Sequence, residues 1–176
     1  EAIILGIVIT PLIALYPLAK RFFILPQFIL ALTYNWGCFI GWAALGSNIP
    51  FSSIFILYLS LIFWTLAYDT IYATQDEKED KNLNLYSSTL LFGSKKMIFL
   101  NLMIITKYFL IIFYGSSLDF GFIFNILVLT ISLINLLDLN LIWKNKPENA
   151  SSYFSRNNYY GISLLFSIII GSHFNV

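Results

Sequence analysis

The segment "FSSIFILYLSLIFWTLAYDTIYATQDEKED", residues 51–80, joins an apolar run to an acidic cluster and decides how the chain folds. Residues 51–67 carry no charge and nearly reach the length of about 20 residues that a helix needs to cross a bilayer. Residues 68–80 hold three of the chain's five aspartates and two of its four glutamates. Because a charge is costly in lipid, we expect these acids to face a polar cavity or the membrane boundary.

The composition predicts an integral membrane protein in contact with the lipid bilayer. The 176-residue chain is 59% hydrophobic and 11% charged, whereas a soluble domain is about 25% charged. A net charge of +1 gives no indication of nucleic-acid binding. The single cysteine, Cys38, allows neither an internal disulfide nor a cysteine metal cluster. The sequence shows no Gly-rich phosphate loop and no cluster suited to Ser-His-Asp catalysis.

Six apolar segments predict an all-α transmembrane helical bundle that forms one membrane domain over residues 1–176. The runs are continuously apolar rather than alternating, which excludes membrane strands. Prolines in the first two segments predict kinks, which membrane helices tolerate. The chain begins at Glu1, directly before an apolar run, and we expect it to be the C-terminal part of a longer protein. The expected spans are 2–19, 22–45, 51–74, 97–115, 121–143 and 158–175.

The basic residues predict the orientation of the bundle. Nine of the ten lysines and arginines lie in three alternate connections, while the connections 46–51 and 115–121 have none. The positive-inside rule places the basic connections, and the acidic cluster with them, in the cytoplasm. We expect a bacterial inner membrane. Lys107 and Asp138 lie inside spans and either pair with each other or face separate polar gaps.

The spacing of the aspartates indicates a cation site. On one continuous helix, Asp69, Asp76 and Asp80 would lie within about 40° of one another, with Tyr72 near the same face. Asp76 and Asp80 repel at a spacing of i, i+4 unless a cation lies between them. Three interpretations remain open: a Mg²⁺–diphosphate site, a proton or cation pathway, or a solvated loop balanced by neighbouring lysines. The first interpretation rests on the preference of Mg²⁺ for oxygen ligands, which carboxylates and substrate phosphates supply together.

The segment "YDTIYATQDEKED" (68–80) resembles the second aspartate-rich motif of the UbiA superfamily of intramembrane prenyltransferases, in its 4-hydroxybenzoate polyprenyltransferase branch. The resemblance covers essentially the whole chain. It implies the last six helices of a nine-helix bundle around a cavity that opens to lipid. The family's first aspartate motif does not occur here, which agrees with missing N-terminal helices of the same protein. The other segments that agree are "YPLAKRFFILPQFILALTYNWG" (16–37), "GWAA" (41–44), "STLLFG" (88–93) and "FSRNNYYG" (154–161).

The resemblance implies Mg²⁺-dependent transfer of a polyprenyl group from polyprenyl diphosphate to 4-hydroxybenzoate, a step of ubiquinone biosynthesis. Asp76 and Asp80 match the family's Mg²⁺-binding aspartates. Asp69 matches an acid of the same motif that orients the site, and Tyr72 also matches a family position. These two are the expected catalytic residues.

The expected substrate-binding residues each have a second interpretation. Lys20 and Arg21 bind substrate, with Arg21 holding the carboxylate of the aromatic acid, or they only set the topology. Asn35 contacts the ligand or bonds to a neighbouring helix. Lys78 and Lys81 contact the diphosphate or simply balance the neighbouring acids.

Three other functions remain open at this point. The chain is a transporter or channel fragment in which Lys107 and Asp138 form a charge relay. Alternatively, it prenylates another acceptor, such as haem, a menaquinone precursor or a glycerophosphate lipid. Finally, it is an inactive truncated copy. The placement of the acids distinguishes the transporter, because a transport site lies near the midplane of the membrane.

Overall fold

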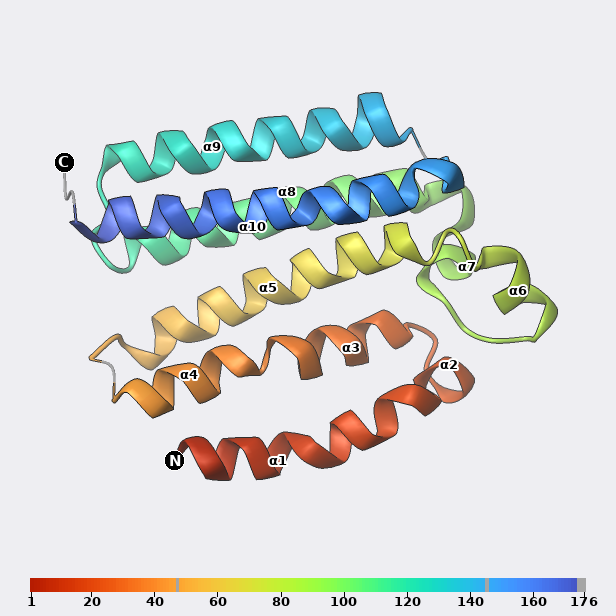
Figure 1. The fold of residues 1–176 in the computed structure, drawn as a ribbon, viewed down its shortest axis with the longest axis horizontal. Coiled ribbons are helices and arrows are strands. Elements are labelled where there is room, and N and C mark those ends of the chain that lie inside the picture. Colours follow the sequence, from red (N-terminus) through yellow and green to blue (C-terminus); the bar gives the residue numbers. More distant parts are fainter. Residues whose placement is uncertain (47, 145, 174–176) are drawn as a thin grey trace.

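The computed structural model describes residues 1–46, 48–144 and 146–173, and every regular element in that part is helical. Figure 1 shows the long helices lying side by side, with the short helices α2, α6 and α7 gathered at one end. The all-α bundle is therefore confirmed. The α-helices are α1 (Ala2–Leu15), α2 (Ala19–Phe22), α3 (Pro26–Asn35), α4 (Gly37–Leu45), α5 (Phe51–Tyr72), α6 (Glu77–Asn82), α7 (Ser88–Phe92), α8 (Lys96–Ser116), α9 (Phe122–Leu137) and α10 (Ala150–His173). Short 3₁₀ segments cover Tyr16–Leu18, Gly93–Lys95 and Pro147–Asn149, and a π-helical segment covers Asp138–Trp143.

Five helical segments are long and apolar enough to cross a membrane: Ala2–Phe22, Pro26–Leu45, Phe51–Tyr72, Ser88–Ser116 and Phe122–Leu141. They coincide with the first five predicted spans. The sixth predicted span, 158–175, falls largely within α10, and its last two residues lie outside the described residues. The 24-residue α10 is not among these five segments, because Arg156 and a pair of asparagines in its first half lower its hydrophobicity. It nevertheless packs against α5 and α9 as a full-length member of the bundle.

Proline and tryptophan residues mark the breaks in the first two spans. Pro11 lies inside α1 without ending it, whereas Pro17 lies in the 3₁₀ turn before α2. Pro26 begins α3, where its missing N–H is not needed. The second span breaks again at Trp36, between α3 and α4. The first span therefore leaves α-helical geometry at Pro17, whereas α1 continues through Pro11.

α5 lies at the centre of the bundle and packs against α3, α8 and α10. α9 packs on α8 through a close approach at Gly115, where a Cβ atom would lie 2.1 Å from the ring of Phe124. α1 instead exposes most of its apolar side chains, including Ile3, Ile4 and Ile7. In a membrane protein such a face lies against lipid or against a further helix.

The two ends of the described chain lie at the same end of the bundle. α1 begins and α10 ends at the end opposite to α6 and α7 (Figure 1). The residues between α5 and α8 therefore share one end with α2 and with the connection between α9 and α10. This arrangement gathers the predicted basic connections and the acidic cluster at a single end, which we call the charged end.

The prediction that one helix carries Asp69, Asp76 and Asp80 on a single face was wrong. α5 ends at Tyr72, residues 73–76 form tight turns, and α6 begins at Glu77. The Thr74 hydroxyl donates to the carbonyl of Ile71 at 2.6 Å. Such local bonds compete with the helical pattern and favour a turn.

Candidate functional site

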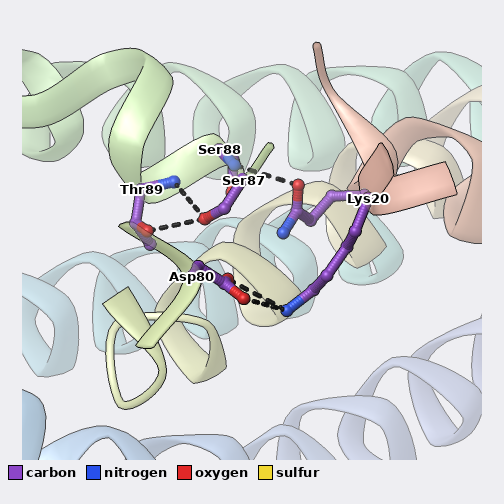
Figure 2. A network of polar contacts seen from close by, with 6 residues as sticks. Lys20, Asp80, Ser87, Ser88 and Thr89 are labelled. Atoms are coloured by element: carbon purple, nitrogen blue, oxygen red, sulfur yellow. Dashed lines mark hydrogen bonds and ion pairs between the residues drawn. The ribbon is translucent and has the colours of Figure 1, made fainter. Parts of the chain in front are cut away.

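A partly buried ion pair organises the charged end. The Lys20 Nζ atom of α2 lies 2.8 and 2.9 Å from the two carboxylate oxygens of Asp80 in α6 (Figure 2). Asp80 is only 4% exposed, whereas the Lys20 side chain is 38% exposed. The Tyr86 N–H donates to the Lys20 carbonyl at 2.8 Å, which fastens the following loop to the same helix. Two segments 60 residues apart in sequence are thus joined at one point.

Buried hydroxyl groups beside this ion pair fix the start of α7. The Ser87 side chain caps α7 by accepting a hydrogen bond from the Thr89 N–H at 3.2 Å (Figure 2). The Ser88 N–H donates to the Gln27 side chain of α3 at 3.0 Å, and the Thr70 hydroxyl of α5 donates to the Ser88 hydroxyl at 2.8 Å. All five residues are buried. α7 is therefore tied to both α3 and α5, and it holds the acidic segment in place.

Two of the three aspartates, Asp80 and Asp69, lie near Lys20, although the three do not share a helix face. Asp69 is half-buried in the last turn of α5, close enough to Lys20 and Asp76 for their charges to act on it. Asp76, also half-buried, precedes α6, and its carbonyl accepts the Asp80 N–H at 2.8 Å. The role of these acids as a metal site stays a prediction, and the cation that the structure places at Asp80 is the Lys20 ammonium.

The donor set fits a metal ion only if another molecule supplies ligands. Among residues 1–46, 48–144 and 146–173, no group of three or more His, Cys, Asp or Glu side chains is placed to hold a metal. Mg²⁺ in phosphate-transfer sites is commonly bound by one or two carboxylates together with substrate phosphates and water. Asp76 and Asp80 are such a pair of carboxylates. They suit a metal shared with a phosphate group, and not one enclosed by the described chain.

An aromatic cavity lies next to the charged end, between α3, α5 and α10. Its volume is about 640 Å³. Tyr68, which precedes Asp69 in α5, lines it, and the ring of Tyr72 packs on Phe154 of its wall with centroids 5.0 Å apart. The cavity lining therefore reaches the last turns of α5, although it includes none of the three aspartates. Its lining consists of Tyr34, Asn35, Leu61, Trp64, Thr65, Tyr68, Phe154, Asn157, Asn158, Gly161, Ile162 and Leu165.

The structure supports the inter-helix interpretation of Asn35, and its contact with a ligand stays a prediction. It lines the cavity, and its Nδ2 atom donates to the Thr65 hydroxyl of α5 at 2.7 Å. The same group donates to the Ala31 carbonyl at 2.8 Å. Asn35 therefore forms an inter-helix hydrogen bond in the wall of the cavity.

The other predicted substrate-binding residues lie apart from the ion pair. Arg21 is exposed next to Lys20 and forms no ion pair with the part of the chain that the structure describes. Lys78 and Lys81 line a second pocket, which includes neither Lys20 nor the aspartates. Their contact with a diphosphate stays a prediction.

Lys107 and Asp138 do not pair with each other, so that hypothesis was wrong. Asp138 accepts hydrogen bonds from Arg156 at 2.9 Å and from the Tyr160 hydroxyl at 2.6 Å. The buried Lys107 ammonium instead lies over the rings of Trp64 and Tyr108, at 4.5 and 3.9 Å from their centroids. Asp138 and Lys107 therefore each contact other residues. The direct contact between them that a transporter's charge relay would use is not present in the described residues.

Sequence reasoning missed the residues that shape the far wall of the cavity. The Trp64 Nε1 atom donates to the Asn157 side chain at 3.0 Å. Its ring lies against Gly161, where a Cβ atom would come within 3.1 Å. The paired asparagines of "FSRNNYYG" were the available signal, because polar amides in a membrane helix require partners.

Comparison with known proteins identifies the family. The model of the UbiA prenyltransferase family matches residues 1–165. The chain belongs to the UbiA prenyltransferase family. A 4-hydroxybenzoate octaprenyltransferase of Francisella tularensis subsp. novicida (strain U112) is 36% identical over 168 residues, which cover 96% of this chain and 59% of the relative. The mitochondrial 4-hydroxybenzoate polyprenyltransferase of Dictyostelium discoideum is 32% identical over 163 residues, covering 91% of this chain and 35% of the relative.

The UbiA chain described here therefore spans 59% of the length of its bacterial relative. The search of solved structures returned no significant match. Family membership and the five helices long and apolar enough to cross a bilayer make it an integral membrane protein.

Proposed function

We propose that the complete protein transfers a polyprenyl group from its diphosphate to 4-hydroxybenzoate, as a step of ubiquinone biosynthesis. One structural observation carries the proposal: the Lys20–Asp80 ion pair and Asp69 lie at the end of the bundle that an aromatic cavity approaches through Tyr68. The names of the two relatives support the substrates. The proposal includes helices upstream of this chain that close the cavity and supply further acidic residues.

In this proposal the charged end holds the diphosphate. Asp76 and Asp80 would hold Mg²⁺, which neutralises charge on the diphosphate and makes it a better leaving group. Lys20 is the nearest cation in the described chain to Asp80, and its exposed fraction of 38% leaves it accessible to a phosphate oxygen as well. Arg21, exposed on the same short helix, would hold the carboxylate of the aromatic acid as a bidentate partner.

The cavity would hold the prenyl chain and protect the reacting carbon. When the bond to diphosphate breaks, positive charge develops on the allylic carbon. Aromatic faces such as those of Trp64 and Tyr68 stabilise a nearby cation and exclude water from it. The ring carbon ortho to the phenol then attacks, and its proton is lost. Asp69 follows the cavity residue Tyr68, and the Tyr72 ring packs on Phe154 of the cavity wall; in this proposal both would orient the reacting groups.

The positive-inside rule supports a cytoplasmic location for the charged end. We propose a bacterial inner membrane for the protein, with both substrates approaching that end. The prenyl diphosphate would enter with its chain in the lipid and its phosphates at the membrane boundary.

An acceptor panel tests this function. Membranes containing the protein, expressed from its complete gene, are incubated with Mg²⁺, polyprenyl diphosphate and one acceptor at a time, and products are identified by mass. We expect a prenylated 4-hydroxybenzoate. If product forms only with a different acceptor, that acceptor replaces 4-hydroxybenzoate as the proposed substrate. An absence of product with every acceptor, from well-expressed protein, would overturn the proposed activity.

A further inference from the structure

A second pocket of about 900 Å³ lies at the charged end, formed by residues between α5 and α8 together with Pro147. It therefore lies at the ends of two segments that are able to cross the membrane, Phe51–Tyr72 and Ser88–Ser116, and includes residues from the start of the second. Its lining consists of Thr74, Glu77, Lys78, Lys81, Asn84, Leu85, Tyr86, Thr89, Leu90, Gly93 and Pro147. Neither Lys20 nor the three aspartates of the candidate site belong to it, and the proposed function does not use it.

The charges on this pocket favour an anion. Lys78 and Lys81 are one helical turn apart on α6, and both are exposed. Neither forms an ion pair with any residue in the described ranges. Glu77, an acid in the same lining, is paired with the Lys96 ammonium. Two uncompensated positive charges therefore remain on the rim.

The uncharged part of the lining combines apolar and hydroxyl groups. Leu85, Leu90 and Pro147 supply apolar surface, while Tyr86 and Thr89 bear hydroxyl groups. A basic pocket with an apolar side at a membrane boundary matches a ligand that has an anionic head and a hydrocarbon tail. Basic pockets at the cytoplasmic ends of membrane helices bind the headgroups of anionic lipids.

We propose that this pocket binds the headgroup phosphate of an anionic phospholipid from the surrounding leaflet, with Lys78 and Lys81 as its cationic contacts. A prenyl diphosphate shares the phosphate and the apolar tail. The pocket lacks the paired carboxylates that a metal-bound diphosphate requires, because its acid Glu77 is already paired with Lys96. Lipid binding should therefore not depend on Mg²⁺, and it does not rest on prenyl transfer.

The test uses the complete protein, purified in a neutral detergent without divalent ions. Phosphatidylglycerol or phosphatidylcholine is added, and bound lipid is counted by native mass spectrometry. The variant Lys78→Gln/Lys81→Gln is compared with Lys144→Gln/Lys146→Gln, which removes the same charge from residues outside the pocket lining. At about 1 kcal/mol per lysine near the surface, the first variant should bind phosphatidylglycerol roughly 30-fold more weakly.

The proposal expects wild-type protein and the Lys144/Lys146 variant to retain phosphatidylglycerol in preference to phosphatidylcholine, and the Lys78/Lys81 variant to lose that preference. Equal losses in both variants would mean that only the overall charge matters, which would overturn the proposal. Equal retention of the two lipids by the wild type would also overturn it. Displacement of bound phosphatidylglycerol by geranyl diphosphate without Mg²⁺ would assign the pocket to the prenyl substrate instead.

Discussion

Removal of the Lys20 ammonium should destabilise the charged end measurably. In Lys20→Met, Asp80 keeps a carboxylate that is 4% exposed but loses both of its contacts, at 2.8 and 2.9 Å. Breaking a fully buried pair costs about 3–5 kcal/mol. Because the Lys20 side chain is 38% exposed, water screens part of that loss. We therefore expect Lys20→Met to lower the free energy of unfolding by about 2 kcal/mol.

The partner substitution completes a double-mutant cycle. Asp80→Asn should cost about 1.5 kcal/mol, and the double variant about 2 kcal/mol, because the second change removes a contact already lost. The coupling energy is then about 1.5 kcal/mol. Unfolding is followed by tryptophan fluorescence in mixed detergent micelles containing EDTA. Arg21→Met, which removes an exposed neighbouring charge, is the matched control and should change little. Additive losses would refute the reasoning.

Four further substitutions test the packing of the bundle. Gly115→Ala should cost about 1–3 kcal/mol of stability, because the new Cβ would meet the ring of Phe124. Gly41→Ala has open space around it and should stabilise its helix by up to about 1 kcal/mol. Equal melting temperatures for the two variants would contradict this packing. Lys107→Met should leave stability unchanged within about 1 kcal/mol or raise it, because it removes a buried ammonium that has no ion pair in the described chain. A drop in melting temperature worth about 2 kcal/mol or more would show that the ring contacts of Lys107 dominate. Asn35→Leu should cost about 0.6 kcal/mol, the average for an inter-helix hydrogen bond in a membrane, and a neutral result in chemical unfolding would count against that bond.

The sequence predicted the spans well because the bilayer imposes a length and a composition on each of them. Residues 51–67 have no charge, so their helix follows from hydrophobicity alone. α10 is the exception, since Arg156 and its neighbouring asparagines weaken the apolar signal. Arg156 bonds to Asp138, and Asn157 accepts from Trp64. Partners elsewhere in the fold thus allow this helix to carry polar groups.

The sequence predicted that the acidic cluster and the basic connections share one end of the bundle, but not the backbone of that cluster. The break after Tyr72 contains neither proline nor glycine, and nothing in the periodicity marks it. A local bond from Thr74 and the long-range pairing of Asp80 with Lys20 decide the backbone there. A contact across 60 residues depends on tertiary packing, which local spacing does not reveal.

The measurement that tests the central claim most directly is the Mg²⁺ dependence of prenyl transfer in matched aspartate variants. Membranes carrying the complete protein are assayed with polyprenyl diphosphate and radiolabelled 4-hydroxybenzoate, with Mg²⁺ or with EDTA. The comparison is between wild type, Asp76→Asn at the charged end, and Asp119→Asn in the loop between α8 and α9. The account predicts that EDTA abolishes product, that Asp76→Asn loses most of it and that Asp119→Asn retains it. Normal, Mg²⁺-dependent product from Asp76→Asn would contradict the assignment of the charged end as the diphosphate site.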